Sequence, residues 1–325
     1  MMDASDQLPD LGRLRLLVEL SRVGTMAAVA ERTGYGTSAV SKHLAVLEQE
    51  VGTRLLTPVG RRVRLTPAGE RLVAHAVGIL SAVEEARAEL RGESGPAGRV
   101  RLASFVSAVE PTVVPALGRL RAEHPRVEVQ LYEHEPEQTL ALLLSGDVDL
   151  GIVYDYSLVP RPVPDGLSAR QFATQPMVLL LPGGHAGDPG PGGPVPLSGL
   201  SRLSGAGWIT NSRGSDDDEL VQRVCAMAGF TPRIVHRVDS LHLVNLLTGA
   251  GLGVALLAES GVERQRDDVV TRPLDPLVGT RRHFLVARAG QWSWPPIATV
   301  ARLLTGVSEP GDGGGQPLRW VSGRS

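Results

Sequence analysis

The sequence predicts an α/β protein made of an N-terminal all-α winged helix-turn-helix, a long linker helix and a two-lobed α/β domain. Three observations carry this prediction. Capped amphipathic helices and a basic hairpin come first, a narrow apolar seam follows, and strands then alternate with helices from Arg99 onward. With 325 residues and 42% hydrophobic content, the chain can bury two or three separate cores.

Capping residues mark the first two helices. Asp10 is a good N-cap for a helix whose apolar positions follow a 3.6-residue period, and Gly24 ends it. Thr25 can cap a second, short helix from residue 26 to residue 32, which Gly34 closes. We therefore expect two short helices joined by a tight turn.

A third helix is expected from about Thr37 to Val51. Its inner face is apolar and its outer face carries small polar residues and one cation, Ser38, Ser41, Lys42 and Ala45. Such a face suits a helix in a DNA major groove, because hydroxyl groups can reach base edges and nothing bulky holds the helix away.

A basic hairpin follows the third helix. Val63 and Leu65 alternate with arginines, Gly60 is placed for the turn, and three arginines form a phosphate clamp, Arg61, Arg62 and Arg64. From Leu11 to Thr66 nine Lys+Arg stand against four Asp+Glu, a formal +5 in a chain of net charge −2. The segment therefore predicts DNA binding, and a protein-interaction module is the alternative.

The linker helix is expected from residue 67 to about Leu90. Apolar residues recur along it at alternating spacings of four and three, which predicts a two-helix contact: Leu72, Ala76, Ile79, Val83, Ala86 and Leu90. The alternative is that this seam packs on its own domain. A two-fold operator requires a dimer in any case. Residues 91–98 then have the composition of a hinge.

The rest of the chain predicts two α/β lobes. Strands are expected at 99–103, 127–132 and 148–154 with helices at 108–123 and 137–145 between them, which indicates a mostly parallel sheet. A second set follows, with strands at 177–181, 208–210, 234–238 and 254–257 and helices at 215–228 and 241–249. Residues 283–287 and 297–304 return to the first sheet.

A ligand of such a domain belongs in the cleft at the carboxyl ends of the strands. Two polar loops are the candidates, one from each lobe: Ser104, Phe105 and Ser107, and Thr210, Asn211 and Ser212. Their hydroxyl, amide and backbone groups could hold a small anion, although helix capping explains them equally well. The acids at 216–219 count against a strongly anionic ligand, and we interpret them as first-turn residues that complement the helix dipole.

Enzyme, metal and membrane signals are missing from the sequence. It has no Gly-x-Ser-x-Gly elbow, and His236, Asp239 and His242 lack a standard metal spacing, so we expect no catalytic residues, no metal and no cofactor. The single cysteine, Cys225, is expected to be a core thiol in a reducing compartment. We find no signal peptide, and the longest apolar run is interrupted, so no membrane partner is expected.

The chain resembles the LysR-type transcriptional regulators over nearly its whole length. The resemblance is carried by Ala39-Val40-Ser41-Lys42-His43-Leu44 in the third helix and, most specifically, by the run Arg61-Arg62-Val63-Arg64-Leu65-Thr66-Pro67-Ala68-Gly69. Where the family usually opens its recognition helix with Ser-Gln-Pro, this chain has Gly36-Thr37-Ser38, and Leu56 and Pro58 replace the usual Phe and Arg. The operator sequences of other family members are therefore not expected to apply to this chain.

The resemblance implies a cytoplasmic regulator that binds double-stranded operator DNA, a small-molecule effector and itself, as a dimer or tetramer, with RNA polymerase as a candidate further partner. It implies an effector domain similar in fold to periplasmic solute-binding proteins. The expected divisions are a DNA-binding domain at 8–66, a dimerisation helix at 67–92, an effector domain at 97–306 and a disordered tail at 307–325. Lobe I takes 97–170 and 272–306, and lobe II takes 171–271.

The expected DNA contacts are polar or basic residues of the N-terminal domain: Thr25, Thr37, Ser38, Ser41, Lys42, Arg54, Arg61, Arg62 and Arg64. From a different functional class, the alternative is a small-molecule-binding protein that acts through protein contacts without specific DNA binding.

Overall fold

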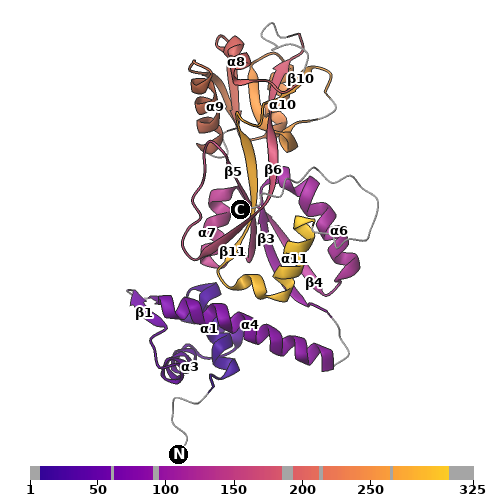
Figure 1. Cartoon of the computed structure of the whole chain (residues 1–325). Helices are drawn as coiled ribbons and strands as arrows, with labels where there is room; N and C mark the ends of the chain where they lie inside the picture. The colour runs from indigo at the N-terminus through magenta and orange to yellow at the C-terminus, as the bar shows by residue number, and fades with distance from the viewer. Residues whose placement is uncertain are drawn as a thin grey trace, which may run out of the picture.

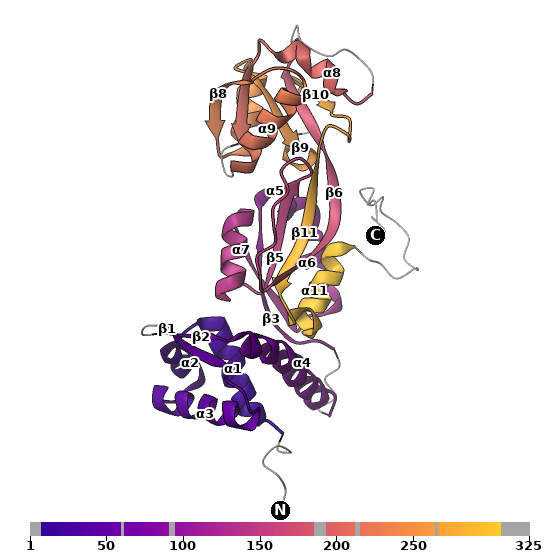
Figure 2. The same ribbon diagram turned by 60° about the vertical axis from the view of Figure 1, so that its left-hand side comes forward.

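The computed structural model describes residues 8–59, 62–90, 95–184, 193–211, 215–263 and 266–306. A small helical domain, one long helix and a tall two-lobed α/β body follow one another along the molecule (Figure 1, Figure 2). Gly60 and Arg61 of the expected turn, residues 91–94 of the expected hinge, Ser212 and the tail at 307–325 lie outside the described residues.

The caps that the sequence predicts set the bounds of the first helices. The side chains of Asp10 and Thr25 each accept a hydrogen bond from the backbone N–H three residues on. Gly24 and Gly34 end their helices at φ of 73° and 75°, in the left-handed region that favours glycine. The helices are α1 (Leu11–Val23), α2 (Met26–Thr33) and α3 (Thr37–Glu50).

The wing joins the third helix to the linker helix. Strands β1 (Leu56–Val59) and β2 (Arg62–Leu65) pair antiparallel, and α4 (Pro67–Leu90) follows. Glu48 of α3 accepts the backbone N–H groups of Leu55 and Leu56 at 2.7 and 2.9 Å and so holds the start of β1. The Thr66 hydroxyl accepts the N–H of Gly69. A Cβ atom on Gly69 would lie 2.3 Å from the Leu55 carbonyl oxygen, so only glycine lets α4 approach the wing this closely.

Lobe I and lobe II each begin as a parallel α/β unit. Lobe I contains β3 (Gly98–Ser104), α5 (Val106–Ala108), α6 (Val114–Glu123), β4 (Val127–Glu133), α7 (Pro136–Ser145) and β5 (Leu150–Tyr156). Lobe II contains α8 (Leu197–Leu200), β7 (Gly207–Asn211), α9 (Ser215–Met227), β8 (Arg233–Val238), α10 (Leu241–Gly249), β9 (Val254–Ala258) and β10 (Val269–Pro273). The expected helix at 108–123 is interrupted by a π-helical turn at Val109–Val113.

Two long strands join the lobes. The strands lie in the order β4-β3-β5-β11-β6-β9-β7-β8, with β10 beside β6. The first ten residues of β6 (Leu167–Pro182) pair with β11 (Thr280–Arg288), and the last six pair with β9 and β10. The chain thus changes lobe inside one strand. The parallel pairing expected for the strands at 99–103, 127–132 and 148–154 is confirmed, since β3 pairs parallel with β4 and β5. In lobe II, β7 also pairs parallel with β8 and β9. Strands β6, β10 and β11 pair antiparallel.

Helices cover both faces of this sheet. In lobe I, α6 and the last helix, α11 (Pro295–Thr305), lie together on one face and α7 lies on the other (Figure 1). Cys225 of α9 is fully buried, and this burial raises its pKa to about 12, which agrees with the expected core thiol. Among the helices described, none is long and apolar enough to cross a membrane.

Candidate functional site

The outer face of α3 is exposed and polar. Val40, Leu44 and Leu47 are buried under it, and α3 lies at the end of the molecule farthest from the α/β body (Figure 2). Four predicted DNA contacts are exposed on this helix: Thr37, Ser38, Ser41 and Lys42. Among the described residues, no element covers this face.

The wing places further predicted contacts beside α3. Arg54 and Arg64 are exposed, and Arg64 stands opposite Thr57 in the hairpin. Arg62 stands opposite Val59 in the same hairpin. Thr25 is half-buried and its hydroxyl caps α2, a structural role that the sequence also predicted. Arg61 lies outside the described residues.

The apolar seam of α4 divides into two parts. Ala76 is fully buried and Leu72 half-buried in the core that α4 forms with α1. Ala76 therefore cannot meet a partner subunit, which corrects the predicted seam at this residue. Further along, Ile79 and Ala86 are exposed and Val83 is half-buried. Leu90 is the last residue of the helix.

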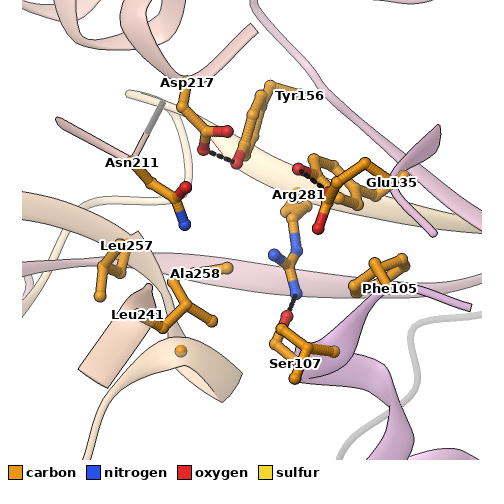
Figure 3. Close-up of a pocket in the computed structure, with 13 residues that line it drawn as sticks. Phe105, Ser107, Glu135, Tyr156, Asn211, Asp217, Leu241, Leu257, Ala258 and Arg281 are labelled. Carbon is orange, nitrogen blue, oxygen red and sulfur yellow. Dashed lines mark hydrogen bonds between the residues drawn. The ribbon is translucent and has the colours of Figure 1, made fainter. Parts of the chain in front are cut away.

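A pocket of about 370 Å³, its open mouth included, lies between the two lobes. Lobe I lines it with Phe105, Ser107, Glu135, Tyr154 and Tyr156, β11 adds Arg281, and lobe II closes it with Asn211, Asp217, Leu241, Leu257 and Ala258 (Figure 3).

The two predicted loops supply part of this pocket. Phe105, Ser107 and Asn211 line it. Ser104 is fully buried and donates to the carbonyl of Phe105, and Thr210 is buried with its hydroxyl on Asp218, so the prediction is corrected at Ser104 and Thr210. Side chains alternate along a strand, and these two point into the lobes instead of the cleft. Ser212 lies outside the described residues.

Arg281 is the main cation of the pocket and is 5% exposed. Its guanidinium carbon lies 4.9 and 4.7 Å from the ring centres of Phe105 and Tyr154. Its Nη2 donates to Ser107 and Ser260, both at 2.9 Å. Its Nε donates to His283, whose pKa burial lowers well below its usual value, so His283 is neutral and accepts.

Two carboxyl groups face the same pocket. Tyr156 donates to Asp217, and Tyr154 donates to Glu135 at 3.1 Å (Figure 3). Burial raises the pKa of Asp217 to about 7, opposed by the tyrosine hydrogen bond and by the charge of Arg281. Asp217 lies in the first turn of α9, as the sequence predicts, and it also lines the pocket.

Sequence reasoning missed Arg281, Asp217, Glu135 and both tyrosines. The only available signal was an arginine within the strand that contains His283, since a charge in a buried strand needs partners. Within the described ranges, no group of three or more His, Cys, Asp or Glu side chains could hold a metal ion.

Comparisons with known proteins match both halves of the chain. Residues 11–70 match the family described as "Bacterial regulatory helix-turn-helix protein, lysR family", and residues 93–308 match "LysR substrate binding domain". The transcriptional regulator YnfL of Escherichia coli is 30% identical over 261 residues, covering 75% of this chain and 83% of YnfL. XapR of the same organism is 28% identical over 272 residues, covering 82% of this chain and 87% of XapR.

Solved structures share the fold. A full-length OxyR variant from Pseudomonas aeruginosa matches with a TM-score of 0.58 at 21% identity, covering 92% of this chain and 97% of that one. Full-length CbnR in complex with its target DNA matches with a TM-score of 0.50 at 22% identity, covering 91% and 97%.

Proposed function

The chain belongs to the LysR family of transcriptional regulators, and from this premise we propose which residues read DNA and where the effector binds. It has the helix-turn-helix and effector-binding domains of that family. The observation that carries the proposal is the uncovered polar face of α3 beside the basic wing, at the far end of a chain whose lobes enclose a polar pocket.

We assign base contacts to α3 and phosphate contacts to the wing. Thr37 and Ser41 can reach base edges from the exposed face of α3, whereas an arginine on a hairpin suits the backbone. Ser38, Lys42, Thr25, Arg54, Arg61 and Arg62 complete the proposed interface. We keep the expected domain boundaries at 8–66, 67–92 and 97–306. Within the last domain, the chain passes from lobe I to lobe II inside β6.

Binding to a randomised operator library at two salt concentrations tests this assignment. Arg64→Ala is expected to weaken all sequences similarly and to lower the salt slope by about one. Thr37→Ala or Ser41→Ala is expected to change preference at particular base pairs by about 1 to 3 kcal/mol. Arg119→Ala, an exposed arginine of α6, is the control and should change neither. The same change of preference from both groups would refute the assignment.

For the effector we propose the interlobe pocket, with promoter control as the output. Val106 lines the pocket and is 40% exposed, so Val106→Trp can fill the space at little cost to folding. Val114→Trp, at an exposed position of α6 outside the pocket, is the matched control. Effector response should be lost in the first variant only, and an unchanged response in Val106→Trp would move the effector elsewhere.

The proposal extends to the setting in which the protein works. We assign it to the cytoplasm as a dimer or tetramer without enzymatic activity, with RNA polymerase as the partner through which the bound regulator acts. The alternative of a ligand-binding protein that lacks specific DNA binding has no support from the relatives, which are transcriptional regulators.

A further inference from the structure

The pocket contains a buried positive charge whose hydrogen-bond partners are all neutral. Among the described residues, the Arg281 guanidinium donates to Ser107, Ser260, Gln175 and His283. All four are neutral, and the flanking rings are aromatic. Its Nη1 has no partner among the described residues and is not sealed from the pocket. A ligand carboxylate would supply the missing charge and an acceptor for Nη1.

The opposite charge is present elsewhere in the same pocket. Asp217 and Glu135 both line it. Each carboxyl group already accepts one hydrogen bond from a tyrosine. Burial raises the pKa of both tyrosines well above the usual value, so their hydroxyls stay protonated donors. A charged carboxylate only accepts hydrogen bonds, so a ligand meets these groups best with N–H donors.

The positive charge of Arg281 and the negative charges of Asp217 and Glu135 lie at different places in the pocket, and this arrangement favours some classes of small molecule over others. A dicarboxylate would set its second carboxylate against Asp217 and Glu135, and an amine alone would leave Arg281 uncompensated. A molecule with a carboxylate at one end and an ammonium at the other satisfies both ends. We propose that the effector is a small zwitterion of the α-amino acid type, bound through its carboxylate by Arg281 and through its ammonium by Asp217 and Glu135.

The same contacts connect the ligand to the arrangement of the lobes. Arg281 holds Ser107 of lobe I and Ser260 of lobe II together, and the hydrogen bond from Tyr156 to Asp217 runs from β5 to α9 across the cleft. A zwitterion would add charge-assisted contacts to both inter-lobe links. The ligand would therefore favour the lobe arrangement in which both of its ends are bound. The size of this shift equals the difference between the ligand's affinities for the two arrangements. This inference rests on the proposed placement of the effector in the pocket.

Calorimetric titration of the full-length chain at pH 8 with the twenty standard amino acids tests the ligand class. For every amino acid that binds, the matched 2-hydroxy acid and the decarboxylated amine are titrated as well. We expect at least one amino acid to bind and each matched compound to bind about tenfold more weakly or worse, because each lacks one of the two charges. Absence of binding by all twenty, or equal binding of the 2-hydroxy acid, overturns the proposal.

Variants then assign the two ends of the ligand. Asp217→Asn keeps an acceptor for Tyr156 but removes the charge, and Arg281→Lys keeps the charge but removes the planar fork. Both are expected to weaken amino acid binding about tenfold or more. Asp218→Asn, in the same helical turn but outside the pocket lining, should bind within about twofold of the unchanged chain. Equal losses in Asp217→Asn and Asp218→Asn would contradict the assignment.

The pH dependence gives an independent reading. Asp217 faces Tyr156 of β5, Arg281 of β11 and Glu135 before α7, with Asp216 beside it on α9. With a pKa of about 7, it is mostly protonated at pH 6 and mostly charged at pH 8. Amino acid affinity should rise about tenfold between these values, and this rise should vanish in Asp217→Asn. A pH-independent affinity overturns the role of Asp217.

These measurements separate the ligand class from the site. Tight binding of a 2-hydroxy acid or a dicarboxylate that is blocked by Val106→Trp would refute the zwitterion and leave the pocket as the effector site. Amino acid binding that survives Val106→Trp, Asp217→Asn and Arg281→Lys would refute both.

Discussion

Replacing Asp217 by Asn should stabilise the folded chain, and by more at high pH than at low pH. The folded structure raises the pKa of this carboxyl group from 3.8 to about 7, chiefly because burial disfavours its charged form. A raised pKa means that the folded state binds the proton more tightly than the unfolded state. The stability that the group contributes is therefore fully present below pH 3.8 and is lost as the pH rises to about 7.

The magnitude follows from the size of the shift. A shift of about three pKa units corresponds to roughly 4 kcal/mol in total, of which about 2 to 3 kcal/mol is lost between pH 5 and pH 8. Asparagine cannot ionise, and its side-chain oxygen still accepts the hydrogen bond from Tyr156. The free energy of unfolding of Asp217→Asn should thus exceed that of the unchanged chain by about 2 to 3 kcal/mol more at pH 8 than at pH 5.

Urea unfolding at both pH values, followed by the fluorescence of Trp208, measures this difference, because Trp208 is buried in the same lobe. Glu219→Gln is the control for loss of a negative charge on the same helix, since its carboxyl group is 45% exposed and pairs with Arg223. Its stability should differ little from that of the unchanged chain at either pH. If the gain in unfolding free energy of Asp217→Asn is equal at both pH values, or larger at pH 5, the pKa of the Asp217 carboxyl group is not raised in the folded state.

Three further outcomes are expected. Ile79→Glu puts a charge on an exposed apolar position of α4, so the monomer should fold while sedimentation shows dissociated subunits; an intact dimer would mean that this part of α4 makes no subunit contact. Gly146→Ala should detach the DNA-binding domain from lobe I, because its Cβ would lie 2.5 Å from the Arg22 carbonyl oxygen and its φ is +82°; unchanged small-angle scattering would contradict this. Glu48→Ala frees two N–H groups at the start of the wing, including that of Leu55, and should cost about 2 kcal/mol in thermal unfolding and weaken operator binding; unaltered binding would show that the wing is held by other contacts.

Capping and periodicity were sufficient to predict the helices of the N-terminal domain. Asp10, Thr25, Gly24 and Gly34 begin and end their helices where the sequence predicts, because capping is a matter of groups three or four residues apart. Periodicity likewise predicted the buried and exposed faces of α3. The family motif at residues 61–69 has a physical reason as well, since Gly69 must let α4 approach the Leu55 carbonyl.

Periodicity was not sufficient for α4. A spacing of four and three shows that a face is apolar, but it does not say whether α1 of the same chain or a second subunit covers that face. In the tertiary structure, Ala76 packs in the core formed with α1, and Ile79 is exposed. The long crossing strand β6 was also half missed, because its first residues are too polar to be predicted as a strand.

The sequence by itself determined the family, the helix-turn-helix and the presence of two α/β lobes, since each depends on short motifs or on local alternation. Only the tertiary structure decided which side chains face the cleft. It turned Ser104 and Thr210 inward and brought Arg281 to Ser107, a residue 174 positions away in the chain. It also set Asp217 against Tyr156, 61 positions apart. Contacts at such separations follow from the order of strands in the sheet, and no period or motif within one segment records that order.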